Sequence, residues 1–273
     1  MKQKIKNGKL CIPLTILFAF VFMILFTGAG KIGADKKLNS IENYIRRQEP
    51  EEPETLTPPV SVDVLILVNK KNRVADNFVP DNLCNLSELV PATKSVIYFN
   101  KQAAADYASM ISGMEEDGLT GLYAVSGYRT YMYQDYLFKQ KVATYKLGKE
   151  QAEIAAGRIV APPGASEHQT GLALDVSARS VAFALNSSFT VTAEYKWLVE
   201  NCHKYGFIIR YPENKRHITE IIFEPWHLRY VGAEHAEAIY EAGICLEEYI
   251  INLEKKESLN DFQPGLTDDD RGS

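Results

Sequence analysis

The sequence predicts an α+β fold in which a small antiparallel sheet carries the functional site and helices flank it. Short apolar runs, partly β-branched, are typical of strands, and they lie at residues 62–68, 122–125, 207–210 and 218–223. Longer segments repeat apolar residues every three or four positions, as helices packed on a core do. These segments lie at residues 101–116, 131–141, 149–156, 192–205 and 233–242.

The individual elements follow from local patterns. The helix at 101–116 places apolar side chains on one face, at Ala104, Tyr107, Ala108 and Ile111. The helix at 192–205 is expected to turn four side chains inward, those of Tyr195, Leu198, Val199 and Cys202. An Ala-Pro-Pro-Gly turn at 161–164 leads into a polar segment that begins at Ser166. We expect the runs at 207–210 and 218–223 to pair as strands.

The N-terminus predicts a membrane anchor. Four lysines precede an uncharged stretch from Leu10 to Gly30, which just reaches the ~20 apolar residues that a spanning helix needs. The small residues at 27–30 leave a cleaved signal peptide open. We favour an uncleaved transmembrane helix with a cytoplasmic N-terminus, which predicts a cell-membrane, single-pass protein whose main domain is extracytoplasmic.

The composition divides the chain into four parts. Residues 1–30 form the cytoplasmic tip and anchor, and the Pro- and Glu-rich residues 31–59 form a stalk that cannot bury a core. Residues 60–253 are expected to fold as one domain, and residues 254–273 as a flexible tail. A formal net charge of −5 argues against nucleic acid as a partner. At most one disulfide can form among the three cysteines after the anchor, Cys84, Cys202 and Cys245.

Two motifs predict a zinc hydrolase. The run from Ser166 to Asp175 supplies His168 and a carboxylate, and the run from Glu224 to His227 supplies a second imidazole. Three such ligands leave a coordination position open for water, and a nearby carboxylate that is not a ligand can take the proton of that water. We therefore predict His168, Asp175 and His227 as zinc ligands and Glu224 as the general base. Pro225 disfavours a helix here, unlike the helical His-Glu-x-x-His arrangement.

Taken singly, these residues have ordinary structural interpretations: Asp175 as a turn or cap residue, and Glu224 as a surface carboxylate. The motifs together, however, resemble the zinc D-Ala-D-Ala carboxypeptidases of the VanY type, a group that includes the VanX dipeptidases and the L,D-carboxypeptidases of peptidoglycan maturation. The resemblance covers roughly residues 60–245 and includes further matching stretches at 67–70, 126–130, 206–212 and 227–232.

The resemblance implies further roles. Arg129 would stabilise the negative charge that develops on the attacked carbonyl. Ser166, Gln134 and Tyr211 are candidate contacts for the substrate, although a turn cap, a helix-face amide and a core aromatic are their alternative interpretations. Three other histidines match no motif and are expected to be structural or surface residues: His203, His217 and His235.

Three functions remain open. The first is a membrane-anchored D,D-carboxypeptidase that removes the C-terminal D-Ala of peptidoglycan stem peptides or lipid-linked precursors, acting as a monomer. The second is an L,D-carboxypeptidase or a peptidoglycan endopeptidase that uses the same site. The third is a non-catalytic, zinc-containing module like the hedgehog-type relatives of this fold; the presence of both Glu224 and Arg129 argues against it. The sequence does not separate a role in glycopeptide resistance from one in routine wall maturation.

Overall fold

The computed structural model describes residues 60–261, and it describes side chains up to residue 259. The predicted anchor at 1–30 and the predicted stalk at 31–59 lie outside these residues. Within them, no helix has the length and apolar character that crossing a membrane requires.

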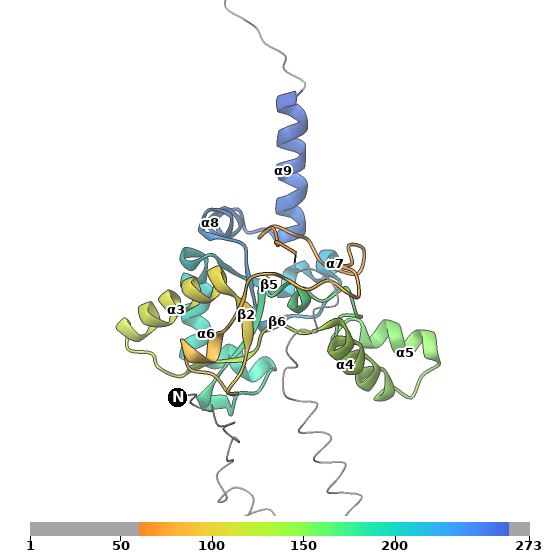
Figure 1. Ribbon diagram of the computed structural model, residues 1–273, viewed down its shortest axis with the longest axis horizontal. Helices are drawn as coiled ribbons and strands as arrows, with labels where there is room; N and C mark the ends of the chain where they lie inside the picture. Colours follow the sequence, from red (N-terminus) through yellow and green to blue (C-terminus); the bar gives the residue numbers. More distant parts are fainter. Residues whose placement is uncertain (1–59, 262–273) are drawn as a thin grey trace, which may run out of the picture. The chain divides into compact units, whose positions relative to one another are not determined.

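The site is built on a four-stranded antiparallel sheet with the order β3-β4-β6-β5; Figure 1 labels its neighbouring strands β5 and β6. Its strands are β3 (Leu122–Ser126), β4 (Ala173–Ala178), β5 (Phe207–Tyr211) and β6 (Glu224–Tyr230). Every residue of β4 is buried, as expected of a strand between two neighbours in a covered sheet. A second, two-stranded sheet pairs β1 (Leu83–Asn85) with β2 (Tyr98–Asn100).

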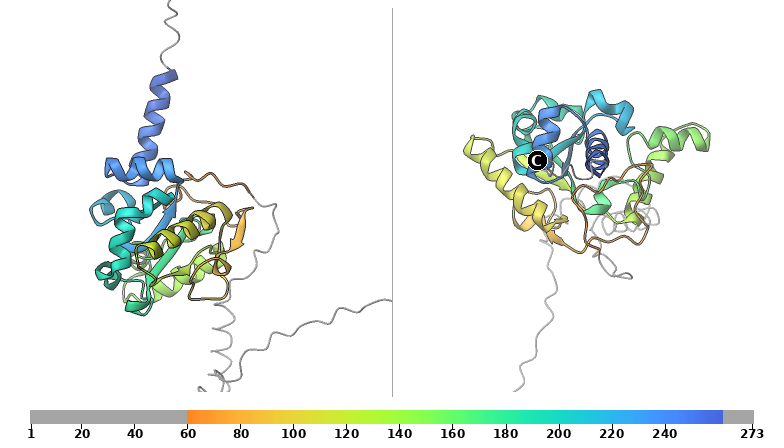
Figure 2. Two further views of the ribbon diagram at one scale, coloured as in Figure 1. Left: turned by 90° about the vertical axis from the view of Figure 1, so that its left-hand side faces the viewer. Right: turned by 90° about the horizontal axis from the view of Figure 1, so that it is seen from above.

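Helices surround the four-stranded sheet, with α3 and α5 at opposite sides of the domain (Figure 2). The α-helices are α3 (Lys101–Glu116), α4 (Tyr131–Ala143), α5 (Lys149–Ala156), α6 (Ala193–Asn201), α7 (Arg216–Thr219), α8 (Ala233–Ala242) and α9 (Leu246–Asp261). Short 3₁₀ segments are η1 (Leu86–Glu88), η2 (Glu167–Thr170), η3 (Arg179–Val181), η4 (Ser187–Val191), η5 (Cys202–Tyr205) and η6 (Glu213–Lys215).

Helix α3 confirms its predicted bounds and its predicted buried face. The side chain of Asn100 accepts hydrogen bonds from the amides of Gln102 and Ala103, which caps the start of the helix. Tyr107, on the buried face of α3, makes an edge-to-face contact with Phe207 of β5 at a centroid distance of 5.8 Å. This contact ties α3 to the sheet that carries the site.

Two predicted strands are wrong. Residues 62–68 form no strand, because two of their carbonyls, those of Val64 and Ile66, accept hydrogen bonds from the Arg229 side chain at 2.9 and 2.7 Å instead of pairing with another strand. Residues 218–223 also form no strand, because α7 runs into them and the chain then turns at Glu220, whose φ is +58°. The strand that pairs with β5 begins only at Glu224.

The end of the domain also differs from the prediction. The side chain of Val199 does not face inward, since the residue is 40% exposed; Trp197 is buried in that region instead. Helix α6 ends at Asn201, and the chain continues as the 3₁₀ segment η5. Because a 3₁₀ helix has fewer residues per turn than an α-helix, the side chains after Asn201 point in other directions than a single α-helix would give them. Helix α9 was not predicted, and it runs across the expected boundary at residue 254 while projecting from the rest of the described domain (Figure 2).

The three cysteines of the described domain are free thiols. Burial raises the pKa of Cys202 to about 12 and that of Cys245 to about 11. Both thiols are therefore protonated and unreactive at neutral pH.

Candidate metal centre

The three predicted metal ligands come from three different elements. His168 lies on η2, Asp175 on β4, and His227 on β6 directly opposite Asp175 in the strand register. Gly171 ends η2 with a φ of +72°, and a Cβ atom there would lie 2.7 Å from Cδ2 of Leu83. A glycine is therefore required to turn the chain from His168 into the strand that carries Asp175.

The three side chains converge closely enough to hold one ion. His168 Nε2 lies 3.3 Å from one carboxylate oxygen of Asp175, and His227 Nδ1 lies 3.2 Å from the other. One ligand atom from each residue lies within 4.8 Å of the others, and all three residues are buried. His168 Nε2 and Asp175 Oδ1 have no hydrogen-bond partner. Buried polar atoms without partners are costly, and a shared metal ion would satisfy them.

The outward-facing nitrogen of each imidazole has a neighbouring acceptor. His168 Nδ1 lies 2.7 Å from the carbonyl oxygen of Gly127, and His227 Nε2 lies 3.5 Å from a carboxylate oxygen of Glu167. An N–H donated outward leaves the lone pair of the other ring nitrogen free for the cluster. This is the orientation that metal-ligating histidines adopt in proteins.

Glu167 was not predicted, although it follows Ser166 directly in the motif. Its side chain is fully buried and forms ion pairs with Arg210 at 2.7 Å and Arg229 at 2.8 Å. Burial alone would raise the pKa of Glu167, but the two guanidinium groups hold it well below its ordinary value. The carboxylate is therefore ionised, and it connects the arginines to His227. Two arginines within apolar strand segments were the signal that could have revealed a buried carboxylate.

Glu224 lies at the start of β6, beside the cluster and outside the set of three ligands. Its carboxylate oxygen is 3.6 Å from His227 Nδ1, and the residue is 7% exposed. Burial raises the pKa of Glu224 to about 8, and a divalent cation next to it would favour the ionised form. A buried carboxylate at this distance suits proton transfer, as the sequence predicted, and its role remains a prediction.

Arg129 also reaches the cluster. Its backbone N–H donates to the carbonyl of His168 at 3.0 Å, and its guanidinium lies 3.6 Å from Asp175. The side chain is 17% exposed. The structure thus brings the predicted oxyanion-stabilising cation to the predicted metal ligands, at a position with access to solvent.

The three candidate substrate contacts are all buried. The ring of Tyr211 lies 4.8 Å from that of His227, and Ser166 immediately precedes η2. The amide of Gln134 donates to the carbonyl of Ala161 at 2.7 Å, while its carbonyl oxygen has no partner. Gln134 therefore has a structural contact, and all three roles remain predictions.

The other histidines lie elsewhere. His203 stacks on Tyr240 at 3.7 Å, and His235 contacts the hydroxyl of Tyr249 at 2.8 Å. His217 lines a separate cavity, described next.

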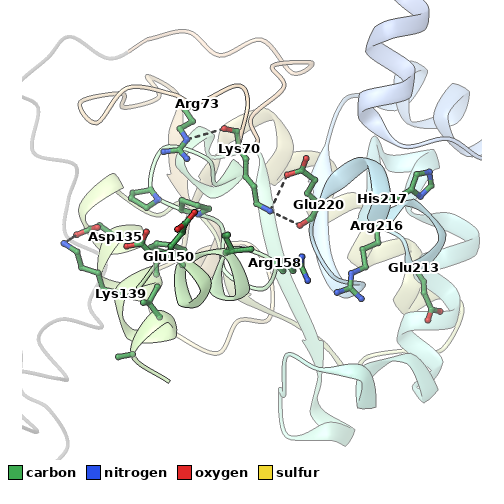
Figure 3. Close-up of a pocket in the computed structure, with 18 residues that line it drawn as sticks. Lys70, Arg73, Asp135, Lys139, Glu150, Arg158, Glu213, Arg216, His217 and Glu220 are labelled. Carbon is green, nitrogen blue, oxygen red and sulfur yellow. Dashed lines mark hydrogen bonds and ion pairs between the residues drawn. The ribbon is translucent and has the colours of Figure 1, made fainter. Parts of the chain in front are cut away.

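A charged cavity of about 1270 Å³ lies between α4, α5 and the η6–α7 segment, and no predicted metal ligand lines it (Figure 3). We call it the outer cleft. Its rim includes Lys70, which contacts Glu220 through both the carbonyl at 3.0 Å and the carboxylate at 3.6 Å. Arg158 and Arg216 also line it. The outer cleft is therefore separate from the predicted metal ligands.

Comparison with known proteins identifies the family. Residues 96–233 match the model of the VanY family, described as D-alanyl-D-alanine carboxypeptidase. The chain belongs to this family. YodJ of Bacillus subtilis (strain 168) is 42% identical over 205 residues, which cover 74% of this chain and 71% of YodJ.

Two solved structures are similar to this VanY-family chain. The LdcB LD-carboxypeptidase is 40% identical with a TM-score of 0.62, and the match covers 71% of this chain and 92% of LdcB. A mutant of the vancomycin-resistance D,D-pentapeptidase VanY, solved in complex with Zn(II), is 37% identical with a TM-score of 0.57, and the match covers 68% and 98% of the two chains. The family and the His-Asp-His cluster together support a zinc-dependent carboxypeptidase.

Proposed function

We propose that this protein is a zinc D,D-carboxypeptidase that removes the C-terminal D-Ala from peptidoglycan stem peptides. One observation supports this most directly: Glu224 and Arg129 both lie against the cluster of His168, Asp175 and His227. A purely structural metal site has no need of a buried carboxylate that is not a ligand and a partly exposed guanidinium. The non-catalytic alternative is therefore disfavoured.

His168, Asp175 and His227 would hold the zinc ion. When bound, zinc supplies Lewis acidity that makes a water molecule acidic near neutral pH and polarises a carbonyl group. Glu224 accepts the proton of the attacking water and returns it to the leaving amine. Arg129 donates hydrogen bonds to the carbonyl oxygen as negative charge develops on it. Glu167, whose carboxylate lies 3.5 Å from His227 Nε2, would help to orient that ring.

An L,D-carboxypeptidase is the second candidate. The similarity to LdcB, at 40% identity, is as strong as the similarity to VanY, at 37% identity. Both reactions remove one D-Ala with the same zinc chemistry, and an endopeptidase could use it as well. The difference lies in the configuration of the residue before the cleaved bond.

The cell membrane, with the domain outside, is the location we propose. It rests on the lysine-flanked apolar stretch at 10–30 and on the Pro- and Glu-rich stretch that follows. Peptidoglycan peptides attached to the wall are available only on that side. Protease added to intact protoplasts should digest the domain, and protection of the domain would contradict this location.

The decisive experiment is digestion of purified stem pentapeptides and tetrapeptides, with the products identified by mass. Loss of D-Ala from the pentapeptide alone supports the D,D-activity, and loss from the tetrapeptide alone supports the L,D-activity. Metal analysis should find one zinc per chain, a chelator should abolish turnover, and His168→Ala should bind zinc poorly. Full activity of the metal-free protein would contradict the proposal.

A further inference from the structure

Lys94 lies on a segment that is anchored along the outer edge of β3. Ala92 and Ala124 form a parallel bridge. The amide of Ala124 donates to the carbonyl of Pro91 at 3.0 Å, and the amide of Thr93 donates to the carbonyl of Ala124 at 2.9 Å. These bonds fix the backbone that immediately precedes Lys94.

The parallel direction of the bridge decides where Lys94 lies. Strand β3 runs toward the metal centre, since Ser126 at its end pairs with Asp175. A segment parallel to β3 runs toward the same end of the sheet. Lys94 is two residues beyond the bridge at Ala92, where the backbone bends, so it lies toward the end of the sheet that carries the metal centre.

The charges that act on Lys94 agree with this placement. Partial burial lowers the pKa of Lys94, the guanidinium of Arg129 lowers it further, and the carboxylate of Asp175 opposes the change. The residue as a whole is nevertheless exposed. Among the described residues, no carboxylate forms an ion pair with its ammonium group. Lys94 is thus a cation without an ion-pair partner, close enough to Arg129 and Asp175 for their charges to act on it.

The proposed reaction requires a cation of this kind. A carboxypeptidase must hold a substrate that carries at least one carboxylate, and recognition of a carboxylate by charge is stronger than recognition by neutral donors. The three candidate substrate contacts, Ser166, Gln134 and Tyr211, are uncharged side chains. Arg129 is already next to Asp175 at 3.6 Å and is assigned to the carbonyl oxygen.

We propose that Lys94 binds a carboxylate of the peptide substrate beside the metal centre. This rests on the proposed peptidase function. The carboxylate could be the C-terminal one or one carried on the part of the peptide before the cleaved bond. Both have the same chemistry, and the peptides used in the test distinguish them.

The test measures peptide binding without turnover. The zinc-loaded full chain carrying Glu224→Gln binds a stem peptide in a calorimeter, with and without Lys94→Gln. Three peptides are compared: the free acid, its C-terminal amide, and the form whose internal carboxylate is amidated. Lys196→Gln, at an exposed lysine on α6, is the matched control, and Lys94→Arg tests whether charge alone restores binding.

We expect Lys94→Gln to weaken binding of the free acid by about threefold to tenfold, as an exposed charged hydrogen bond does. The effect should shrink in high salt, Lys94→Arg should recover most of the affinity, and Lys196→Gln should match the parent. The peptide that lacks the bound carboxylate should no longer distinguish Lys94→Gln from its parent. In the active enzyme, the substitution should raise KM more than it lowers kcat.

Equal losses on all three peptides would overturn the proposal, because they would indicate a structural role for Lys94. Unchanged binding of the free acid would overturn it as well. Binding is measured separately from turnover, so an enzyme that binds peptides through Lys94 but cleaves none of them would contradict the proposed function alone. Failure of the parent to bind any of the peptides would contradict both proposals.

Discussion

The metal centre and the outer cleft contain the same kinds of charged residue in opposite environments. In the metal centre, Asp175 is 4% exposed and Glu167 is fully buried. In the outer cleft, the side chains of Lys70 and Glu220 pair while 26% and 46% exposed. Solvent screens the exposed Lys70–Glu220 pair much more than it screens the buried carboxylates of the metal centre. Burial together with polar atoms that have no hydrogen-bond partner therefore marks the metal centre of this protein.

The largest effect should come from the buried carboxylate behind His227. Glu167→Gln removes the charge that balances Arg210 and Arg229, and breaking a buried ion pair in this way typically costs about 3–5 kcal/mol. Urea unfolding should show this loss. Glu220→Gln, in the exposed pair of the outer cleft, should cost about 1 kcal/mol or less. Equal losses for the two variants would mean that burial does not make the charges of the metal centre more important for stability than those of the outer cleft.

The next effect concerns catalysis. Glu224→Gln keeps the shape of the side chain but cannot accept a proton, so we expect kcat to fall by roughly 10²-fold or more. Zinc content, measured by mass spectrometry, should stay at the wild-type level. His227→Ala should instead lose the metal. A Glu224→Gln protein without zinc, together with a His227→Ala protein that retains it, would mean that the two roles are reversed.

Glu224 and Glu167 show what the sequence could and could not predict about the site. His168, Asp175, Glu224 and His227 lie within two short motifs, so their chemistry and spacing could be recognised locally. Glu167 lies in the same motif, but its partners are 43 and 62 positions away. No local pattern connects a carboxylate to arginines at that separation, and only the folded sheet brings them together.

In the fold, too, local features could be predicted and contacts between distant segments could not. The helices at 101–116, 149–156 and 233–242 have their predicted bounds, because the apolar spacing that predicts them is local. The strand predictions at 62–68 and 218–223 failed, since an apolar run forms a strand only if another strand is available to pair with it. For residues 62–68, the Arg229 side chain takes that place.

A smaller effect should depend on pH. Glu247 of α9 accepts two hydrogen bonds from Arg210, at 2.9 and 2.7 Å. Burial raises the pKa of Glu247, but Arg210 outweighs it and lowers the pKa below its ordinary value of 4.5. A depressed pKa stabilises the fold above the unfolded-state pKa, and this stability is lost as the pH falls through the folded-state pKa.

Glu247→Gln should therefore lower the free energy of unfolding by roughly 1.5–3 kcal/mol at neutral pH. The difference from the wild type should shrink as the pH falls below about 4.5. Urea unfolding across this range is the measurement. A difference that stayed constant with pH would mean that the packing of α9, and not the charge of Glu247, provides the stability.

Arg129→Lys should reduce kcat by about tenfold and change KM less, because lysine keeps the charge but lacks the planar pair of donors. Steady-state kinetics on the cleaved stem peptide is the measurement. A change confined to KM would instead assign Arg129 to the substrate carboxylate, the role proposed for Lys94. The two residues would then have exchanged functions.

The smallest effect should come from the outer cleft. Arg158 and Arg216 line it and are exposed, so charge changes there are screened by solvent. Arg158→Gln and Arg216→Gln should each leave kcat/KM on free stem peptides within about twofold of wild type and stability within about 0.5 kcal/mol. A large rise in KM for either variant would mean that the substrate extends into the outer cleft. In that case the cleft and the metal centre would be parts of one binding site, and burial alone would not delimit it.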